Sequence, residues 1–469
     1  MKYFLLCLVA WVSFCVPFSF ATDFYVDPSK GSDSNDGSRQ HPWKNLNEVI
    51  ESRVATQDWD VLPYRKATRL IAKNSEGKIK GGDTIWLNSG DYGDLRITGM
   101  YNSKPIRIFA SAGAKPRFHS MVIRSAAHWE LKGLFISPVF GSGKKPSTLA
   151  VIMCHGHTGP THDITLEDCT IFSVWDSSDW NKTDWNSLVC SGIQAEGNKI
   201  TIRHNYLKNV NFGITVGATH ALIEHNTIEN FAGDGMRGLG DYSVFQYNTV
   251  KNCYDVNGNH DDGFQSWTRS KDGKVAKGRI VGVVLRGNRF INFEDVNQPF
   301  RGTLQGIGCF GGMYVDWVIE NNIVIVDHWH GITLMGAKGC RIMNNTLLDA
   351  KPGIPGPPWI RIDNRQDGKL STDCIVRNNL APSLHIVANK NMTVDHNLTF
   401  KNPYKIFRNP AQQDVHLRTD SPAIDAGVAS DAPTKTSTAT PVLKPAKLTS
   451  AHTNLRPIRQ MPLKNKANK

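Results

Sequence analysis

Side chains that could exchange protons or bind a cation gather in one stretch of the chain, from Asn248 to Trp267 (NTVKNCYDVNGNHDDGFQSW). Within it, His260, Asp261 and Asp262 follow one another in a segment with glycines on both sides. An imidazole takes and gives protons near neutral pH, and carboxylates beside it can orient the ring or supply oxygen ligands to a cation. The stretch therefore indicates acid/base chemistry or a metal site, provided that the fold brings further groups beside it.

The same stretch interrupts a repeated phrase. ITIRHNYLKN, ALIEHNTIEN, SVFQYNTVKN and WVIENNIVIV each alternate apolar and polar residues around an asparagine, and the step between copies is as short as 18 residues. Alternation with a period of two is typical of a strand with one buried face, and coils this short leave no room for a crossover helix. We therefore expect a β-solenoid of parallel strands in which one position forms a column along the stack. The column comprises Cys169, Asn205, Asn226, Asn248, Asn288, Asn322, Asn345, Asn379 and Asn397.

Three further segments carry a family resemblance. They are FYVDPSKGSDSNDGSRQHPWKNLNEVI and GGDTIWLNSGDYGDLRI near the N-terminus, and SPAIDAG near the C-terminus. With the repeat, they resemble the right-handed parallel β-helix proteins of the pectate-lyase-like superfamily over most of the chain. The resemblance implies an all-β fold, a single right-handed parallel β-helix. Helices over 43–55 and 65–72 are expected to form an N-terminal cap on the open end of the stack.

The chain is expected to divide into four parts. Met1-Lys2, an apolar run and a small residue at Ala21 are typical of a cleaved secretory signal over residues 1–21, so we expect a secreted or periplasmic protein. Residues 22–80 would form the N-terminal segment with its helical cap, and 81–430 the β-helix. Residues 431–469, rich in Thr, Pro, Ala and Lys, are expected to be a basic, disordered tail. No later segment is long and apolar enough to span a membrane.

Composition limits the partners. The chain has 54 Lys and Arg against 42 Asp and Glu, a net charge of +12. In an exported protein this surplus favours an anionic partner, and on charge alone polysaccharide, lipid headgroups and nucleic acid all stay open. We expect a monomer that binds an acidic polysaccharide and does not bind nucleic acid. The cysteines after the signal are odd in number and scattered, so buried thiols are expected rather than a disulfide framework or a zinc pattern.

A second strand follows in each coil, and its apolar residue sets a register. Segments such as FGITVGA, DGMRGLG, DGFQSWT and HGITLMG, together with TLQGIGC aligned on Leu304, leave one polar residue on the outward face of each strand. The predicted polar ladder comprises Gln194, Thr215, Arg237, Gln265, Gln305, Thr333 and Arg361.

Acidic and basic residues precede the ladder at matching distances. Asp234, Asp262 and His330 stand three positions before their ladder residues, and Arg301 stands four before Gln305. The insertion is therefore predicted to bring His260 and its aspartates to one edge of the ladder. A solvated sheet face, turn-capping aspartates and a packed His330 are the structural alternatives.

Aromatic residues add a possible binding surface. Trp175, Trp180 and Trp185 recur at intervals of five in a polar loop, while Trp267 and Trp359 lie beside the ladder. Indole faces stack well on the apolar faces of sugar rings, so these residues could bind carbohydrate. Anchoring of the loop onto the solenoid is the alternative.

The resemblance implies a chemistry for these groups. Lyases of the superfamily use a base on the outward face of the strands and a cation or calcium that neutralises the uronate carboxylate. By that likeness, the candidate catalytic residues are His260 as the base, Arg237 or Arg301 as the carboxylate clamp, His330 as a second acid or base, and Asp234 and Asp262. Substrate contacts would come from Gln265, Gln305, Arg301, Trp267, Trp180 and Arg361. The three acids Asp234, Asp261 and Asp262 would bind calcium or orient His260.

The expected reaction is β-elimination in a uronate-containing polysaccharide, and three alternatives remain open. An epimerase begins with the same proton abstraction, and the His-Asp-Asp triplet is loosely similar to the Asp-Pro-His-Asp element of alginate epimerases, without the proline. A hydrolase could use Asp234 and Asp262 as acid and base on successive coils. A glycan-binding β-helix without catalysis is the last.

Overall fold

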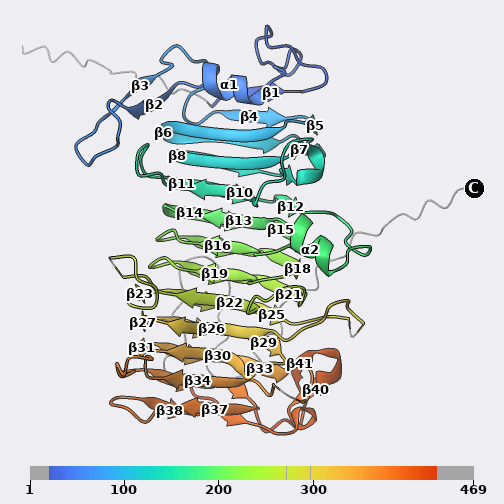
Figure 1. The fold of residues 1–469 in the computed structure, drawn as a ribbon, viewed down its shortest axis with the longest axis vertical. Coiled ribbons are helices and arrows are strands. Elements are labelled where there is room, and N and C mark those ends of the chain that lie inside the picture. The colour runs from blue at the N-terminus through green and yellow to red at the C-terminus, as the bar shows by residue number, and fades with distance from the viewer. Residues whose placement is uncertain (1–20, 271, 296, 354, 430–469) are drawn as a thin grey trace, which may run out of the picture.

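The fold is a long stack of coils (Figure 1). The computed structural model describes residues 21–270, 272–295, 297–353 and 355–429. Each coil contributes up to three short strands, and strands of successive coils pair in parallel along the stack. The predicted signal peptide, apart from Ala21, and the predicted tail over 431–469 lie outside the described residues. Among the helices of the described part, none is long and apolar enough to cross a membrane.

Three strand faces run the length of the stack. The ladder sheet holds β8 (Ser120–Lys132), β10 (Thr148–Met153), β13 (Ser191–Ala195), β16 (Ile214–Val216), β19 (Met236–Gly238), β22 (Asp262–Trp267), β26 (Gln305–Gly311), β30 (His330–Met335), β34 (Trp359–Asp363) and β37 (Ser383–Ile386). The second face holds β11 (His162–Glu167), β14 (Asn198–Arg203), β17 (Leu222–Glu224), β20 (Val244–Gln246), β24 (Val284–Arg286), β28 (Val318–Glu320), β32 (Arg341–Met343), β35 (Ile375–Arg377) and β38 (Thr393–Asp395). The third sheet holds β5 (Gly90–Asp91), β7 (Pro116–Phe118), β9 (Phe135–Ile136), β12 (Thr170–Phe172), β15 (Tyr206–Val210), β18 (Thr227–Phe231), β21 (Thr249–Cys253), β25 (Arg289–Ile291), β29 (Ile323–Val326), β33 (Thr346–Asp349), β36 (Leu380–Ala381) and β39 (Leu398–Thr399).

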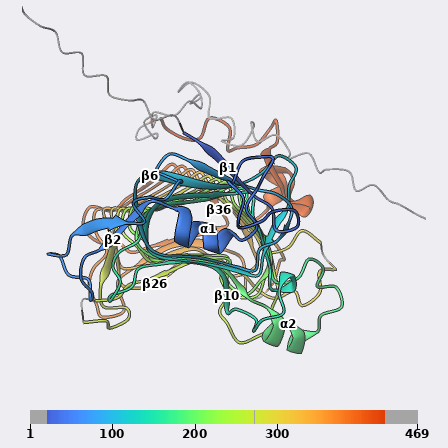
Figure 2. The same ribbon diagram turned by 90° about the horizontal axis from the view of Figure 1, so that it is seen from above.

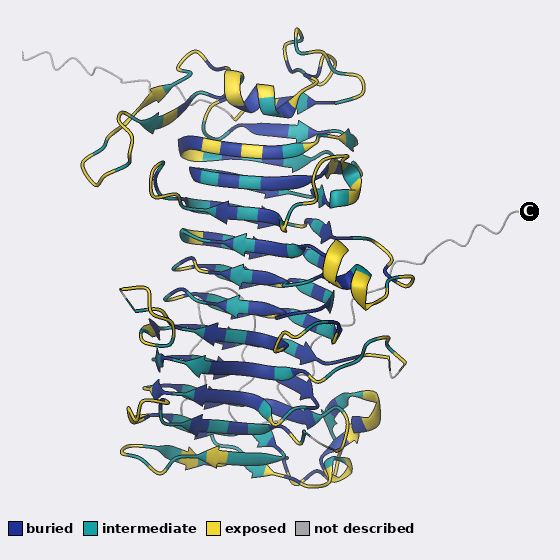
Figure 3. Cartoon of the chain, viewed as in Figure 1, coloured by how far each residue is buried: buried dark blue, intermediate teal, exposed yellow. Residues whose placement is uncertain are grey.

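The first coils join the ladder sheet to the second face. β8 pairs with both β10 and β11, because its 13 residues run around the corner between the two faces. The 17-residue β6 (Asp94–Ala110) does the same one coil earlier, and β4 (Thr84–Leu87) and β1 (Asp23–Val26) extend the stack to its N-terminal end. Inward-facing apolar side chains from all faces form one continuous buried core, seen as the dark bands in Figure 3.

The asparagine column is present as predicted. In its middle, the Asn248 Oδ1 atom accepts hydrogen bonds of 3.0 Å from both the backbone N–H and the side-chain Nδ2 of Asn226. The Asn248 Nδ2 atom in turn donates to the carbonyl of Ile223 and to Asn288 Oδ1. The same bonding continues to Asn397 at the last coil. Each buried amide therefore satisfies its neighbour and the turn beside it.

The N-terminal cap is only partly helical. The helix α1 (Leu46–Arg53) begins after Asn45, whose side chain accepts from the Glu48 N–H, and it lies across the open end of the stack (Figure 2). The helix predicted over 65–72 is wrong, because that segment ends in β3 (Leu70–Lys73), which pairs antiparallel with β2 (Thr56–Trp59). Leu70 and Ile71 are exposed there, so a helix would have had no apolar face to bury.

The remaining elements decorate the stack. They are α2 (Lys182–Leu188), the short sheet of β23 (Arg279–Val281), β27 (Met313–Val315) and β31 (Ala337–Lys338), the C-terminal hairpin of β40 (Phe407–Asn409) and β41 (Asp414–Leu417), and the 3-10 turns Pro138–Phe140, Pro403–Lys405 and Pro410–Gln412. All seven cysteines of the described residues are free thiols, and only Cys154 among them is not fully buried. The prediction of buried thiols is confirmed for the other six.

Candidate active site

The polar ladder forms with one error in the predicted register. Strand pairing aligns Gln194, Thr215, Arg237 and Gln265, then continues through Thr333 and Arg361. Between Gln265 and Thr333, however, the aligned residue is Gly308. The predicted place of Gln305 is wrong because Leu304 and Ile307 are both buried, and the strand aligns on Ile307.

The shift places Gln305 in the column of acids instead. Gln305 pairs directly with Asp262, and the Asp262 N–H donates to Asp234 Oδ1 over 3.1 Å. His330 stands three residues before Thr333 on the following coil. One edge of the ladder sheet therefore carries Asp234, Asp262, Gln305 and His330 on successive coils. The sequence predicted this position for Asp234, Asp262 and His330.

Asp234 forms an ion pair with Arg237, the ladder residue of the same coil. The Arg237 Nε atom donates to Asp234 Oδ2 over 2.5 Å, and the guanidinium lies 3.6 Å from the ring centre of Phe212. Burial raises the pKa of Asp234, while the charge and hydrogen bond of Arg237 oppose that shift. The acid is only 1% exposed, so its role is to orient Arg237 rather than to meet a ligand.

Asp262 lies under the ladder and not on it. It is 0% exposed; its Oδ2 accepts from Gln265 Nε2 over 2.8 Å, and its buried Oδ1 has no hydrogen-bond partner. A Cβ at Gly308 would stand 2.2 Å from that Oδ1, so glycine interrupts the ladder to make room for the carboxyl group. Burial, with the charges of Asp234 and Asp261, raises the pKa of Asp262 well above its ordinary value.

Asp261 is similarly destabilised as an anion. Burial, followed by repulsion from Asp234 and Asp255, raises the pKa of Asp261 to about 8, although a hydrogen bond with Cys253 opposes the shift. Its Oδ1 atom is also buried without a partner. The insertion thus adds two acids that favour the neutral form beneath the sheet surface.

Histidines form the accessible part of the same edge. Burial lowers the pKa of both His328 and His330 to about 4, so each ring is neutral at pH 7. The two rings are stacked with centroids 5.1 Å apart. His260 is exposed on its loop, and its charge is a further cause of the lowered pKa of His328.

His330 is held by the ladder itself. Its Nδ1 atom is 3.0 Å from Thr333 Oγ1, and the Trp359 Nε1–H donates to the same oxygen over 3.1 Å. The positive charge of Arg361 is among the causes of the low pKa of His330. Arg361 itself is paired with Asp363. The ring of Trp359 contacts both groups, with its centre 5.4 Å from that of the His330 ring and 5.4 Å from the Arg361 guanidinium.

Aromatic rings extend both edges of the ladder. Trp329, 39% exposed, stacks with Trp359 at a centroid distance of 6.1 Å. At the other edge, Trp267 lines a pocket of about 240 Å³ together with Arg269 and Arg279, and neither arginine forms an ion pair with any residue in the described ranges. The sequence analysis did not predict these arginines, Trp329 or His328 as site residues. The His-Trp-His pattern before Gly331 was the available signal for Trp329 and His328.

Two predicted contacts lie elsewhere. Trp180 packs edge-on against Trp185, which is fully buried and also contacts Tyr254 of the insertion, so the tryptophan loop is anchored to the loop that carries His260. Arg301 lies over the ring of Phe293, 3.2 Å from its centre. It stands seven residues before the true ladder position Gly308, and its predicted place beside the ladder is therefore wrong.

The fit to calcium is poor in this arrangement. Within the described ranges, only His128, His162 and Asp163 form a group of three potential ligands whose atoms all lie within 4.8 Å of one another. Asp234, Asp261 and Asp262 do not, and two of them are already bonded to Arg237 and Gln265. Calcium prefers six or more oxygens at one point, so no catalytic step is assigned to it here.

Comparisons with known proteins agree with the fold. Residues 191–364 match the family described as the right handed beta helix region. A structure of XylC with xylose superposes with a TM-score of 0.50 at 10% identity, over 80% of this chain and 83% of that one. A GH136 lacto-N-biosidase from Eubacterium ramulus gives 0.43 at 15% identity over 80% and 68%, and the A-module of the Azotobacter vinelandii mannuronan C-5 epimerase AlgE6 gives 0.43 at 12% over 69% and 91%. No curated protein matches the sequence. The chain is a right-handed parallel β-helix protein.

Proposed function

We propose that this protein is a carbohydrate-active enzyme that cleaves an acidic, uronate-containing polysaccharide by β-elimination. The observation that carries the proposal is a half-buried His330, whose pKa is lowered to about 4, on the strand that pairs with the strand of Arg361. Abstraction of the proton beside a uronate carboxylate needs a base that is unprotonated at the working pH and a positive charge that stabilises the developing enolate.

In this proposal His330 is the base. If its Nδ1–H donates to Thr333 Oγ1, the Nε2 atom keeps its lone pair for the substrate. The negative carboxylate of a bound uronate would raise the pKa of the ring and so strengthen it as a base. Arg361 would exchange its ion pair with Asp363 for that carboxylate, the bond to the leaving oxygen breaks, and exposed His260 is the candidate that protonates the leaving group.

Further sugar units would lie along the ladder. Arg237, held by Asp234 and within 5.3 Å of the Trp267 ring, is the candidate clamp for a second carboxylate. It is three strand spacings from Thr333, roughly 14 Å at the usual distance between paired strands. Gln265 lies between them. With the arginines of the Trp267 pocket, it would complete a positively charged surface for an anionic chain. Calcium remains a prediction that needs the carboxyl groups of the acids to rearrange.

A hydrolase is disfavoured by burial. Acid and base must both reach the glycosidic bond, with room for water when the configuration inverts. Asp234 and Asp262 are 1% and 0% exposed, and neither side chain opens to the groove. The epimerase shares the first step of the lyase, and its distinction lies in the product.

The experiment is a panel of uronate polymers, alginate, pectate and glucuronan, incubated with the purified protein. An elimination creates an unsaturated uronate that absorbs at about 235 nm. The proposal expects absorbance with at least one polymer, lost in the variant His330→Gln. A changed uronate ratio without absorbance would show that the protein is an epimerase and not a lyase. New reducing ends without absorbance would show hydrolysis. Retention on a glycan column without any turnover would show that the protein only binds glycan.

A further inference from the structure

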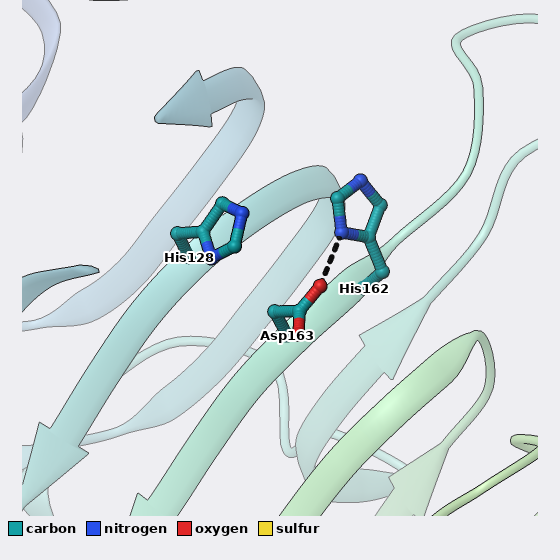
Figure 4. Close-up of side chains that lie close together, drawn as sticks. All are labelled: His128, His162 and Asp163. Carbon is teal, nitrogen blue, oxygen red and sulfur yellow. Dashed lines mark hydrogen bonds and ion pairs between the residues drawn. The ribbon is translucent and has the colours of Figure 1, made fainter. Parts of the chain in front are cut away.

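A cluster of nitrogen and oxygen ligands lies at the corner between the ladder sheet and the second face, and its second strand is four coils before Asp262. His128 belongs to β8, and His162 and Asp163 begin β11 of the next coil (Figure 4). The pairing of His162 with Ala127 and of Ile164 with Trp129 sets Asp163 directly opposite His128. Two strands thus present three potential ligands at one point, and none of the three belongs to the ladder.

The ligand atoms are already close together. One atom from each side chain forms a set whose members all lie within 4.8 Å of one another. The His162 Nδ1 atom is 2.8 Å from Asp163 Oδ2, and the rings of His128 and His162 are perpendicular with centroids 5.7 Å apart. In a tetrahedral zinc site with ordinary bond lengths the ligand atoms lie roughly 3.3 Å apart. Small side-chain rotations would therefore close the set around an ion.

The surroundings fit an open site. The side chains of His162 and Asp163 are 36% and 32% exposed, which leaves space for water as a further ligand. The backbone of His128 is held by a 3.3 Å hydrogen bond from Asn102 Nδ2 to its carbonyl. Lys199, which follows Asp163 at the same corner of the next coil, is exposed and forms no ion pair with any described residue, so it leaves the carboxylate available.

We propose that His128, His162 and Asp163 bind a divalent transition-metal ion of the zinc class. Two imidazole nitrogens and one carboxylate oxygen suit zinc, cobalt or nickel, whereas calcium and magnesium prefer oxygen alone. The ion links two successive coils. The site is independent of the proposed reaction, because it shares no residue with the His330 edge.

The test uses the full mature chain without a histidine tag, stripped of metal by chelation and dialysis. Calorimetric titration with zinc chloride should give one site, and cobalt chloride should give the visible absorption of a cobalt complex with a mixed nitrogen and oxygen ligand set. Saturation should raise the thermal midpoint, since the ion binds only the folded chain. His128→Ala and His162→Ala should each weaken zinc at least tenfold.

Matched variants separate this site from adventitious binding. His220→Ala changes a histidine at the same corner two coils beyond Asp163, and His155→Ala changes the nearby exposed loop; both should leave the affinity unchanged. Circular dichroism of each variant checks the fold, and His162→Asn keeps much of the side-chain volume if the alanine variant unfolds. Absence of binding at about 100 µM zinc, or binding that only His155→Ala removes, would overturn the proposal.

Discussion

Two columns of polar residues run along the same solenoid, and they are built in opposite ways. In the asparagine column, each described coil from Asn205 to Asn397 carries the same residue, and each side chain is bonded to the next. In the column of Asp234, Asp262, Gln305 and His330, two acids are followed by an amide and an imidazole, and Asp262 and Gln305 each keep a buried oxygen without a partner. Repetition with full satisfaction holds the stack together, whereas variation with unsatisfied groups marks the place where chemistry is expected.

The largest effect should come from breaking the repeated column. Asn248→Ala removes an acceptor for the backbone N–H and Nδ2 of Asn226 and a donor to the Ile223 carbonyl, all buried. Each buried group left unpaired costs about 1–3 kcal/mol, so the free energy of unfolding should fall by roughly 4 kcal/mol or more. Denaturant unfolding measures it. Asn397→Ala, at the half-buried end of the column, should cost clearly less; equal costs would contradict the contribution of burial.

Asp261, which precedes Asp262 of the varied column, should make stability depend on pH, whereas the asparagine column should not. The pKa of Asp261 is raised to about 8 in the folded chain, so between about pH 4 and 8 the folded state holds a proton that the unfolded state releases. Stability contributed by this group is therefore complete in acid and declines as pH rises through that window. Asp261→Asn should gain stability relative to the parent by up to about 1.4 kcal/mol per pH unit. Parallel curves for the two proteins would contradict the raised pKa.

The acid limb of the pH profile of catalysis should lie near the lowered pKa of His330. Because the pKa of His330 is lowered to about 4, the base is lost only in strong acid. We expect kcat/KM to fall tenfold per unit below about pH 4, with no acid limb near pH 6.5, where an ordinary histidine titrates. A profile on the cleaved polymer measures this. An acid limb centred near 6.5 would contradict the assignment of His330 as the base.

Removal of the Thr333 hydroxyl, which lies beside His330 Nδ1, should have a smaller effect on activity. Thr333→Val removes the hydroxyl that lies 3.0 Å from His330 Nδ1, and the ring loses the group that selects its tautomer. We expect about a tenfold loss of kcat/KM with little change in KM. Thr333→Ser keeps the hydroxyl and serves as the matched control. Similar losses in both variants would assign Thr333 to packing alone.

The asparagine column could be predicted completely from the sequence, and the column of acids, Gln305 and His330 only in part. Nine aligned copies of the phrase, eight of them with asparagine in the column, leave a single register, so the asparagine bonds could be predicted. Gln305 was displaced because Leu304 and Ile307 compete for the same inward position, and only packing decides between them. The depth of Asp262 was not predictable either, since it depends on Gly308 of the following coil, which leaves the space that the carboxyl group fills. The neutral state of His330 likewise arises from burial that no local pattern encodes.

The most direct test of the account compares His330→Gln with the parent on the uronate polymer that the parent cleaves. His225→Gln, in the stacked pair of His204 and His225, is the control for loss of a histidine from the solenoid surface. The account predicts a loss of kcat/KM of at least about 100-fold for His330→Gln, an unchanged thermal midpoint, and full activity for the control. Activity of His330→Gln within a few fold of the parent would contradict the assignment of His330 as the base.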